Sequence, residues 1–251
     1  MRPIFYVLLV FMACGFGSCT RHQVIRLASD HPQTLQRAFV VETDTLLLTY
    51  NFSGEGGPVA ISIYNKLNHP LFIDWRQSSL IVGGQVFPYV EGPSEGYVYE
   101  ALGGPFGALP LRSSQDVALV PPHSYLQSPL FWLAPTPYQG LPGDVWQERR
   151  GGRLFKRQGY SAATSPVYIR SYLAFGTDRP LTHPFYQQTT FWLEEVLQTT
   201  SARYVRLVRN EQWGDTFTVQ QQNDSRVLAA SSLTLLSSVM MSLLLVAAWG
   251  G

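Results

Sequence analysis

The chain has 251 residues, of which 45% are hydrophobic, 13% are aromatic and only 14% are charged, and its formal net charge is +1. This near-neutral balance gives no overall basic field of the kind that nucleic-acid binding requires, so nucleic acid is not an expected partner. Both cysteines, Cys14 and Cys19, lie near the N-terminus. This position excludes a disulfide framework in the rest of the chain.

Residues 1–18 have the features of a secretory signal: Arg2 is positive, residues 4–13 are apolar, and small residues follow. The apolar run is shorter than the ~20 residues that a membrane-spanning helix needs. The sequence FGSC that ends at Cys19 resembles the lipobox of bacterial lipoproteins, with Phe16 where that family usually has an aliphatic residue. The resemblance implies that Cys19 is acylated and begins the mature chain. The alternative is an ordinary signal peptide with an incidental cysteine.

Residues 19–37 are polar and without clear periodicity, and they predict a tether that leads into a β-domain over residues 38–222. Between residues 46 and 89, short apolar runs alternate with Gly, Pro and Asn turn residues. This pattern predicts consecutive antiparallel strands, each buried on one face. Further strands are predicted over residues 38–42, 117–120, 124–126, 130–133, 167–175, 191–197, 203–208 and 216–220. Long irregular loops are predicted over residues 91–116 and 136–164, and no helix is expected in the middle of the chain.

The fold class that follows is all-β, an antiparallel β-sandwich. The sequences IYNK at 63–66, PLFIDWRQSS at 70–79 and VPPHS at 120–124 resemble uncharacterised lipoproteins of the Bacteroidota. This resemblance implies an immunoglobulin-like sandwich in the cell envelope. It implies no catalytic activity and no site residue.

Residues 227–249 contain no charged side chain and are rich in Leu, Val and Ala. A helix over this length covers the ~30 Å hydrocarbon core, so the segment predicts a C-terminal transmembrane helix. One alternative is a helix buried against protein. Another is a eukaryotic glycolipid-anchor signal, in which the apolar tail is removed.

Five cations between the predicted strands form the main cluster of charge: Arg149, Arg150, Arg153, Lys156 and Arg157. Because basic residues near an anionic membrane bind lipid phosphates, they are candidate anion or lipid contacts. The alternative is a solvated loop.

No string of residues indicates a catalytic site, a metal site or a cofactor. Asp74 has no visible carboxylate partner, and Trp75 is expected to pack in the sandwich. Adjacent side chains of a strand point to opposite faces, so Glu194 and Glu195 are not expected to act as a pair.

The sequence therefore favours a membrane-anchored lipoprotein of the bacterial envelope, with a periplasmic domain. We expect it to act as a non-enzymatic binding or assembly module, with membrane lipid and other envelope proteins as partners. One alternative is an envelope hydrolase that acts on glycans through carboxylates brought together by the fold. The other is the eukaryotic glycolipid-anchored surface protein.

Overall fold

The computed structural model describes residues 21–89, 109–110, 116–127, 131–133, 138, 140–150 and 153–221. The predicted signal segment (1–18), Cys19, most of the predicted loop over 91–116 and the predicted membrane helix (227–249) lie outside these ranges. Within the described ranges, no helix has both the length and the hydropathy needed to cross a bilayer.

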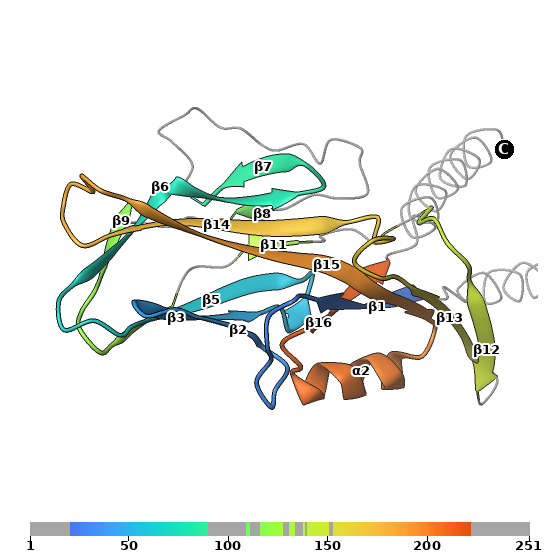
Figure 1. The fold of residues 1–251 in the computed structure, drawn as a ribbon. Coiled ribbons are helices and arrows are strands. Elements are labelled where there is room, and N and C mark those ends of the chain that lie inside the picture. The colour runs from blue at the N-terminus through green and yellow to red at the C-terminus, as the bar shows by residue number, and fades with distance from the viewer. Residues whose placement is uncertain are drawn as a thin grey trace, which may run out of the picture. The chain divides into compact units, whose positions relative to one another are not determined.

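The described strands form two sheets (Figure 1). The first sheet has the order β4 (Gly54–Glu55), β16 (Thr216–Gln221), β1 (Arg21–Ala28), β15 (Phe185–Thr199), β14 (Tyr168–Gly176), β6 (Leu71–Val82) and β7 (Gln85–Pro88). Three more strands extend it: β9 (Val117–Val120) pairs with β6, β13 (Arg153–Gly159) pairs with β15, and β12 (Trp146–Arg150) pairs with β13. The second sheet has the order β2 (Phe39–Glu42), β3 (Leu46–Asn51), β5 (Pro58–Asn65), β11 (Phe131–Trp132) and β8 (Leu109–Pro110), and β10 (Tyr125–Gln127) also pairs with β5. The predicted all-β fold is confirmed at this level.

The long strand β15 organises the first sheet. Strand β1 pairs with its second half along one edge, from Trp192 to Thr199. On the other edge, β14 pairs with its first half and β13 pairs with Glu195 to Thr199. The hairpin of β12 and β13 is therefore attached at the same end of β15 as the first residues of β1.

The predicted meander over residues 46–89 is only partly correct. Strands β3 and β5 pair as expected, and so do β6 and β7. However, β5 and β6 belong to different sheets, so the chain crosses between layers at residues 66–70. The polar residues RQSS at 76–79 lie inside β6, where the register against β14 shifts and Ser78 Oγ accepts a hydrogen bond from the Ala174 amide. A local irregularity lets one strand continue through this polar stretch.

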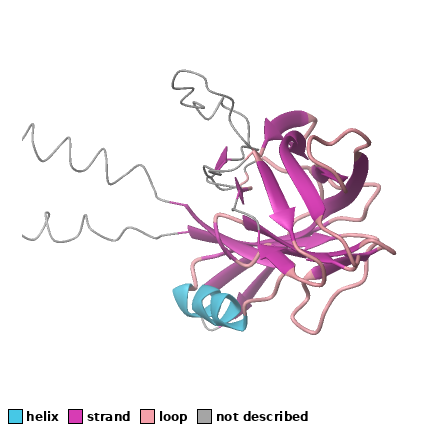
Figure 2. Cartoon of the chain, turned by 90° about the vertical axis from the view of Figure 1, so that its left-hand side faces the viewer, coloured by secondary structure: helices cyan, strands magenta, loops and turns pink. Residues whose placement is uncertain are grey.

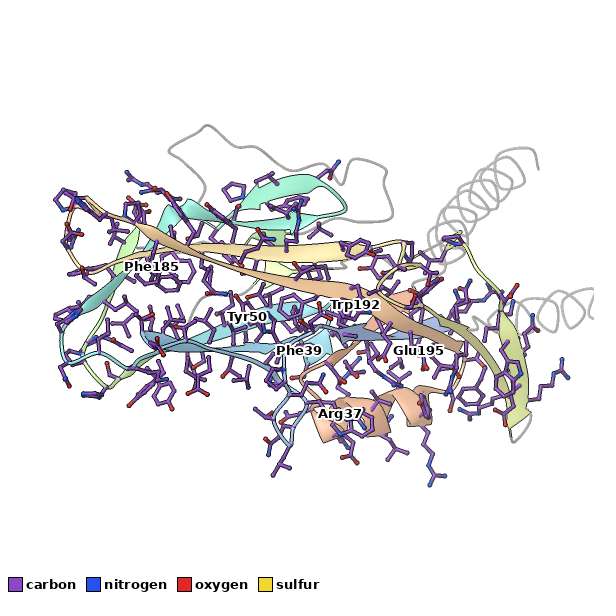
Figure 3. All side chains as sticks on the ribbon, viewed as in Figure 1. Arg37, Phe39, Tyr50, Phe185, Trp192 and Glu195 are labelled. Carbon is purple, nitrogen blue, oxygen red and sulfur yellow. The ribbon has the colours of Figure 1, made fainter. Side chains whose placement is uncertain are left out.

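The two sheets pack against each other through an aromatic cluster around Phe191 of β15. The Phe191 ring lies 5.1 Å from that of Phe39, 5.0 Å from that of Tyr50 and 5.0 Å from that of Phe52, all three from β2, β3 or the residue after β3. Phe39 and Tyr50 lie between the layers in Figure 3. A polar contact joins the same layers, because the Tyr50 hydroxyl donates to Ser171 Oγ at 3.1 Å. Burial of these rings supplies much of the stabilisation of the interface.

The predicted strand over residues 203–208 is wrong, because these residues belong to the helix α2 (Ala202–Glu211) (Figure 2). Ser201 caps its N-terminus by accepting a hydrogen bond from the Tyr204 amide at 3.3 Å. Val205 and Val208 pack against Val24 of β1 and Leu197 of β15. The run RYVRLV fits both a period of two and a period of 3.6, and the cap together with this packing favours the helix.

The predicted tether over residues 19–37 is also wrong for its first half, since residues 21–28 form β1. Val24 contacts α2 while the adjacent Ile25 enters the main core. With both faces covered, this strand lacks the alternation that identifies a strand in a sequence. Residues 22–221 form one compact unit, which begins well before the predicted domain boundary at residue 38.

Candidate functional site

The basic segment is a β-hairpin and not the predicted irregular loop. Strand β12 pairs with β13 so that Trp146 lies opposite Arg157 and Arg150 lies opposite Arg153. The sequence contains a signal for this hairpin, because the pair Gly151-Gly152 separates two short strand-like runs and Gly-Gly is common in hairpin turns. The many charged side chains concealed the alternation of those runs.

The hairpin separates its side chains onto two faces. Directly opposed residues share a face, so Trp146, Glu148, Phe155 and Arg157 lie on one side of the ribbon. These four side chains line a cavity of about 80 Å³ together with Leu197 and Tyr204. The rings of Phe155 and Tyr204 meet edge to face at 5.5 Å, which joins the hairpin to α2.

The cations of the hairpin differ in how far they are neutralised. Arg157 Nε lies 3.5 Å from Glu195 Oε1, and Arg153 donates to the Ser201 hydroxyl at 3.2 Å. Arg149 and Lys156 lie on the opposite face of the ribbon and form no ion pair with another described side chain. Among the hairpin cations whose side chains the structure describes, these two are available to an anion from outside.

The start of β1 lies in register with the hairpin across β15, so that residues of the three strands form one row across the sheet. His22 pairs with Thr199, and Thr199 pairs with Phe155 on its other side. Burial and the nearby Arg209 lower the pKa of the His22 imidazole, against a smaller opposing effect of Glu55, and its Nδ1 atom is buried without a hydrogen-bond partner.

The last strand ends on the same side. Strand β16 neighbours β1 and begins beside the last residues of β1, because the Leu27 amide donates a hydrogen bond to the Asp215 carbonyl at 2.8 Å. Strand β16 therefore runs back toward the beginning of β1. The beginning of β1, the end of β16 and β13 lie together on the right of Figure 1.

A second cavity, of about 410 Å³, lies beside β1 and is polar. Its lining includes Ser29, His31, Arg26, Arg37, Glu194 and Asp215. Both carboxylates face arginines: Arg26 Nη1 lies 3.8 Å from Glu194 and Arg37 Nη1 lies 3.9 Å from Asp215. The Ser29 hydroxyl donates to the Thr190 carbonyl at 2.7 Å and accepts from the His31 amide at 3.4 Å, so both of its hydrogen bonds are to the backbone.

An irregularity in strand pairing interrupts the simple alternation from which Glu194 and Glu195 were predicted not to act as a pair. The register between β1 and β15 shifts between Arg26 and Leu27, so one extra residue is accommodated in β15 at this point. As a result the guanidinium of Arg26 reaches both carboxylates, at 3.8 Å for Glu194 and 3.4 Å for Glu195. Arg157 of the hairpin also contacts Glu195, which makes an ionic cluster between the two cavities.

Trp75 and Asp74, which the sequence analysis also considered, have structural roles. Trp75 is buried, with 2% of its surface exposed, and its ring lies 5.5 Å from that of Tyr89, as the sequence predicted. Asp74 accepts hydrogen bonds from the Arg76 amide and the Gln77 side chain within β6. In the part of the chain that the structure describes, no three His, Cys, Asp or Glu side chains are grouped in a way that could hold a metal ion.

An exposed aromatic strip follows β14 and β15 on the outer face of the first sheet. Tyr168 lies opposite Trp192, and the rings of Tyr172 and Tyr186 stack at 5.0 Å with an angle of 18°. Tyr168 is 40% exposed and Tyr186 is 46% exposed. The sequence predicted the strands but not that these rings would share one exposed face.

Comparisons of the chain with family models, with curated proteins and with solved structures find no match.

Proposed function

We propose that this chain is a membrane-anchored lipoprotein of the bacterial cell envelope, with a periplasmic domain that acts as a non-enzymatic binding or assembly module. Acylation of Cys19 would provide one anchor, and a helix over residues 227–249 would provide the other. The domain itself we assign to the immunoglobulin-like sandwiches. Two packed sheets and a chain that crosses between them after β5 support this assignment.

The observation that carries the proposal is the position of the two ends of the domain. Cys19 lies three residues before His22, and residue 227 lies six residues after Gln221. Fully extended, these segments reach at most about 10 Å and about 20 Å. Because β1 begins and β16 ends on the same side of the sheet, both anchors could enter one membrane without unfolding a strand.

The exposed aromatic strip supports a role in binding. Exposed Tyr and Trp side chains on a rigid sheet are typical of protein interfaces, because they offer large contact area at a low cost in conformational entropy. Tyr168 and Tyr186 are held by regular strand pairing and by stacking, so the surface is ordered before a partner arrives. We propose this strip as the surface for another envelope protein.

Metabolic labelling with a fatty-acid probe tests the anchor at Cys19. We expect labelled wild-type chain in a bacterial host, no label on Cys19→Ala, and full label on the matched control Cys14→Ala, since residue 14 would leave with the signal peptide. Equal labelling of wild type and Cys19→Ala would contradict the proposal.

The C-terminal anchor is tested by fractionation of the same cells. Cys19→Ala and a chain truncated after residue 226 should each stay with the membranes, and only the combination should release the domain. Mass spectrometry of the mature chain adds a control, because loss of residues 227–251 would instead favour the glycolipid-anchor alternative.

The polar cavity beside β1 favours one second candidate, the envelope hydrolase, because it gathers Glu194 and Asp215 in one place. Against it, each carboxylate already faces an arginine. The test is release of reducing sugar ends from isolated envelope glycan by the purified full chain. Activity that disappears in Glu194→Gln, and persists in the distant exposed variant Gln188→Ala, would favour the hydrolase over the binding module.

A further inference from the structure

We propose that the β12–β13 hairpin is a docking surface for an anionic phospholipid bilayer and holds the domain against the membrane in a fixed orientation. This inference rests on the proposed function, because it assumes that the domain is anchored to that membrane. It adds the lipid class that is recognised and the part of the domain that recognises it.

The charge of the hairpin is complementary to an anionic surface. Residues 146–159 carry five cations and one carboxylate, a net charge of +4, whereas the whole chain has +1. The rest of the chain therefore carries −3, and an anionic surface repels it. The positive charge is concentrated on one ribbon, which gives the domain a side that an anionic surface attracts.

Two of the hairpin cations are free to bind lipid phosphates. Arg149 is exposed, Lys156 is half-buried, and neither forms an ion pair with another described side chain. A Lys or Arg close to an anionic leaflet strengthens association by about fivefold. Arg149 and Lys156 together would account for about 25-fold, before the partly neutralised arginines of the hairpin contribute.

The short segment between Cys19 and β1 limits how far the hairpin can lie from the membrane. An acylated Cys19 in the membrane interface would keep His22 within about 10 Å of the surface. Phe155 lies two strand spacings from His22 in the same row, which is another distance of about 10 Å within the sheet. The hairpin therefore starts from a position beside the membrane.

The direction of the strands brings the first residues of β13 to the same side as the first residue of β1. Strand β1 runs away from the row of Thr199 toward residue 28, and its first residue, Arg21, lies past this row in the opposite direction. Strand β13 reaches this row at Phe155, and its earlier residues Leu154 and Arg153 extend past the row on the same side. Arg153 of the hairpin and Arg21 of β1 therefore lie on the same side of this row.

The experiment uses the full chain in proteoliposomes and measures the distance from a hairpin label to the lipid headgroups. Gln147 is exposed and shares the face of Arg149 and Lys156, so Gln147→Cys carries a spin label there. Vesicles of phosphatidylcholine, with or without phosphatidylglycerol, contain a nickel-chelating lipid whose ion relaxes nearby spin labels. We expect faster relaxation, by at least about twofold, in the vesicles with phosphatidylglycerol, and loss of this difference at high salt, which screens surface charge.

Matched variants decide whether the hairpin is responsible. Arg149→Gln with Lys156→Gln should reduce relaxation to the value in phosphatidylcholine alone. Arg76→Gln with Arg170→Gln removes the same charge but should change nothing, since Arg170 pairs with Thr190, about 30 Å along β15 from Thr199. A label at Gln188→Cys should relax equally in both vesicles.

Flotation of the vesicles distinguishes a failure of the proposed membrane anchoring from a failure of the docking surface alone. Failure of the wild-type chain to float with either vesicle would overturn the proposed function and this inference with it. A chain that floats, but whose Gln147 label relaxes equally with and without phosphatidylglycerol, would overturn the docking surface and leave the anchored module intact. An equal loss of relaxation in both pairs of charge variants would also overturn it.

Discussion

Replacing Phe191 with Ala tests the contact that joins the two sheets. Phe191 is completely buried and its ring contacts three aromatic rings from the opposite sheet, at 5.0 to 5.1 Å. A buried Phe→Ala change typically costs about 3–5 kcal/mol, through reduced burial and the cavity that remains. Because the change also removes three ring–ring interactions, each usually worth about 0.5–1.5 kcal/mol, we expect a cost near the upper end of that range.

The assay is thermal and denaturant unfolding of the full chain in detergent. For a domain of this size, about 4 kcal/mol lowers the melting temperature by about 8–16 °C. Tyr186→Ala is the matched control, because Tyr186 lies on the same strand with its ring exposed, and it should cost less than about 1.5 kcal/mol. A cost below about 1 kcal/mol for Phe191→Ala would refute the reasoning that the two sheets are packed through this ring.

Three further predictions concern α2, the turn before β16 and the start of β1. Ser201→Ala should lower the free energy of unfolding by about 1 kcal/mol, because it removes the cap of α2 and the partner of Arg153, and denaturant titration will measure this; a neutral result would mean that the cap is not formed. Gly214→Ala should destabilise by at least about 2 kcal/mol, since the new Cβ would lie 2.6 Å from the Ala38 Cα, and a soluble variant of wild-type stability would contradict that packing. The pKa of His22 is lowered in the folded state, so the unfolded chain takes up its proton first as the pH falls below about 6.5, and stability should fall over that range. His22→Leu should reduce this dependence of the melting temperature on pH, and an unchanged dependence would show that His22 is not responsible.

The sequence predicted best the strands that have one buried and one exposed face. Strand β14 was expected over 167–175 and is found over Tyr168–Gly176, and β16 was expected over 216–220 and is found over Thr216–Gln221. In β14 the buried Ile169, Ser171 and Leu173 alternate with more exposed neighbours. An alternation of apolar and polar residues can be recognised in a sequence only where the two faces of a strand differ in burial in this way.

The failures have a common physical cause, which is contact from a second element. Strand β1 was missed because α2 covers the face of Val24 while the core covers Ile25. The shared contact of Glu194 and Glu195 with Arg26 depends on a register shift that no spacing in the sequence records. The cavity beside the hairpin could not be predicted from the sequence either, since two of its lining residues, Leu197 and Tyr204, come from β15 and α2.

The most direct test of membrane docking is to map where lipid touches the domain. The full chain is incorporated into phosphatidylglycerol-containing vesicles with a photoactivatable phospholipid, illuminated, digested and analysed by mass spectrometry. Docking through the hairpin predicts lipid adducts on peptides from residues 146–157. Adducts confined to residues 177–184, which connect β14 and β15 at the opposite end of the sheet, would contradict it.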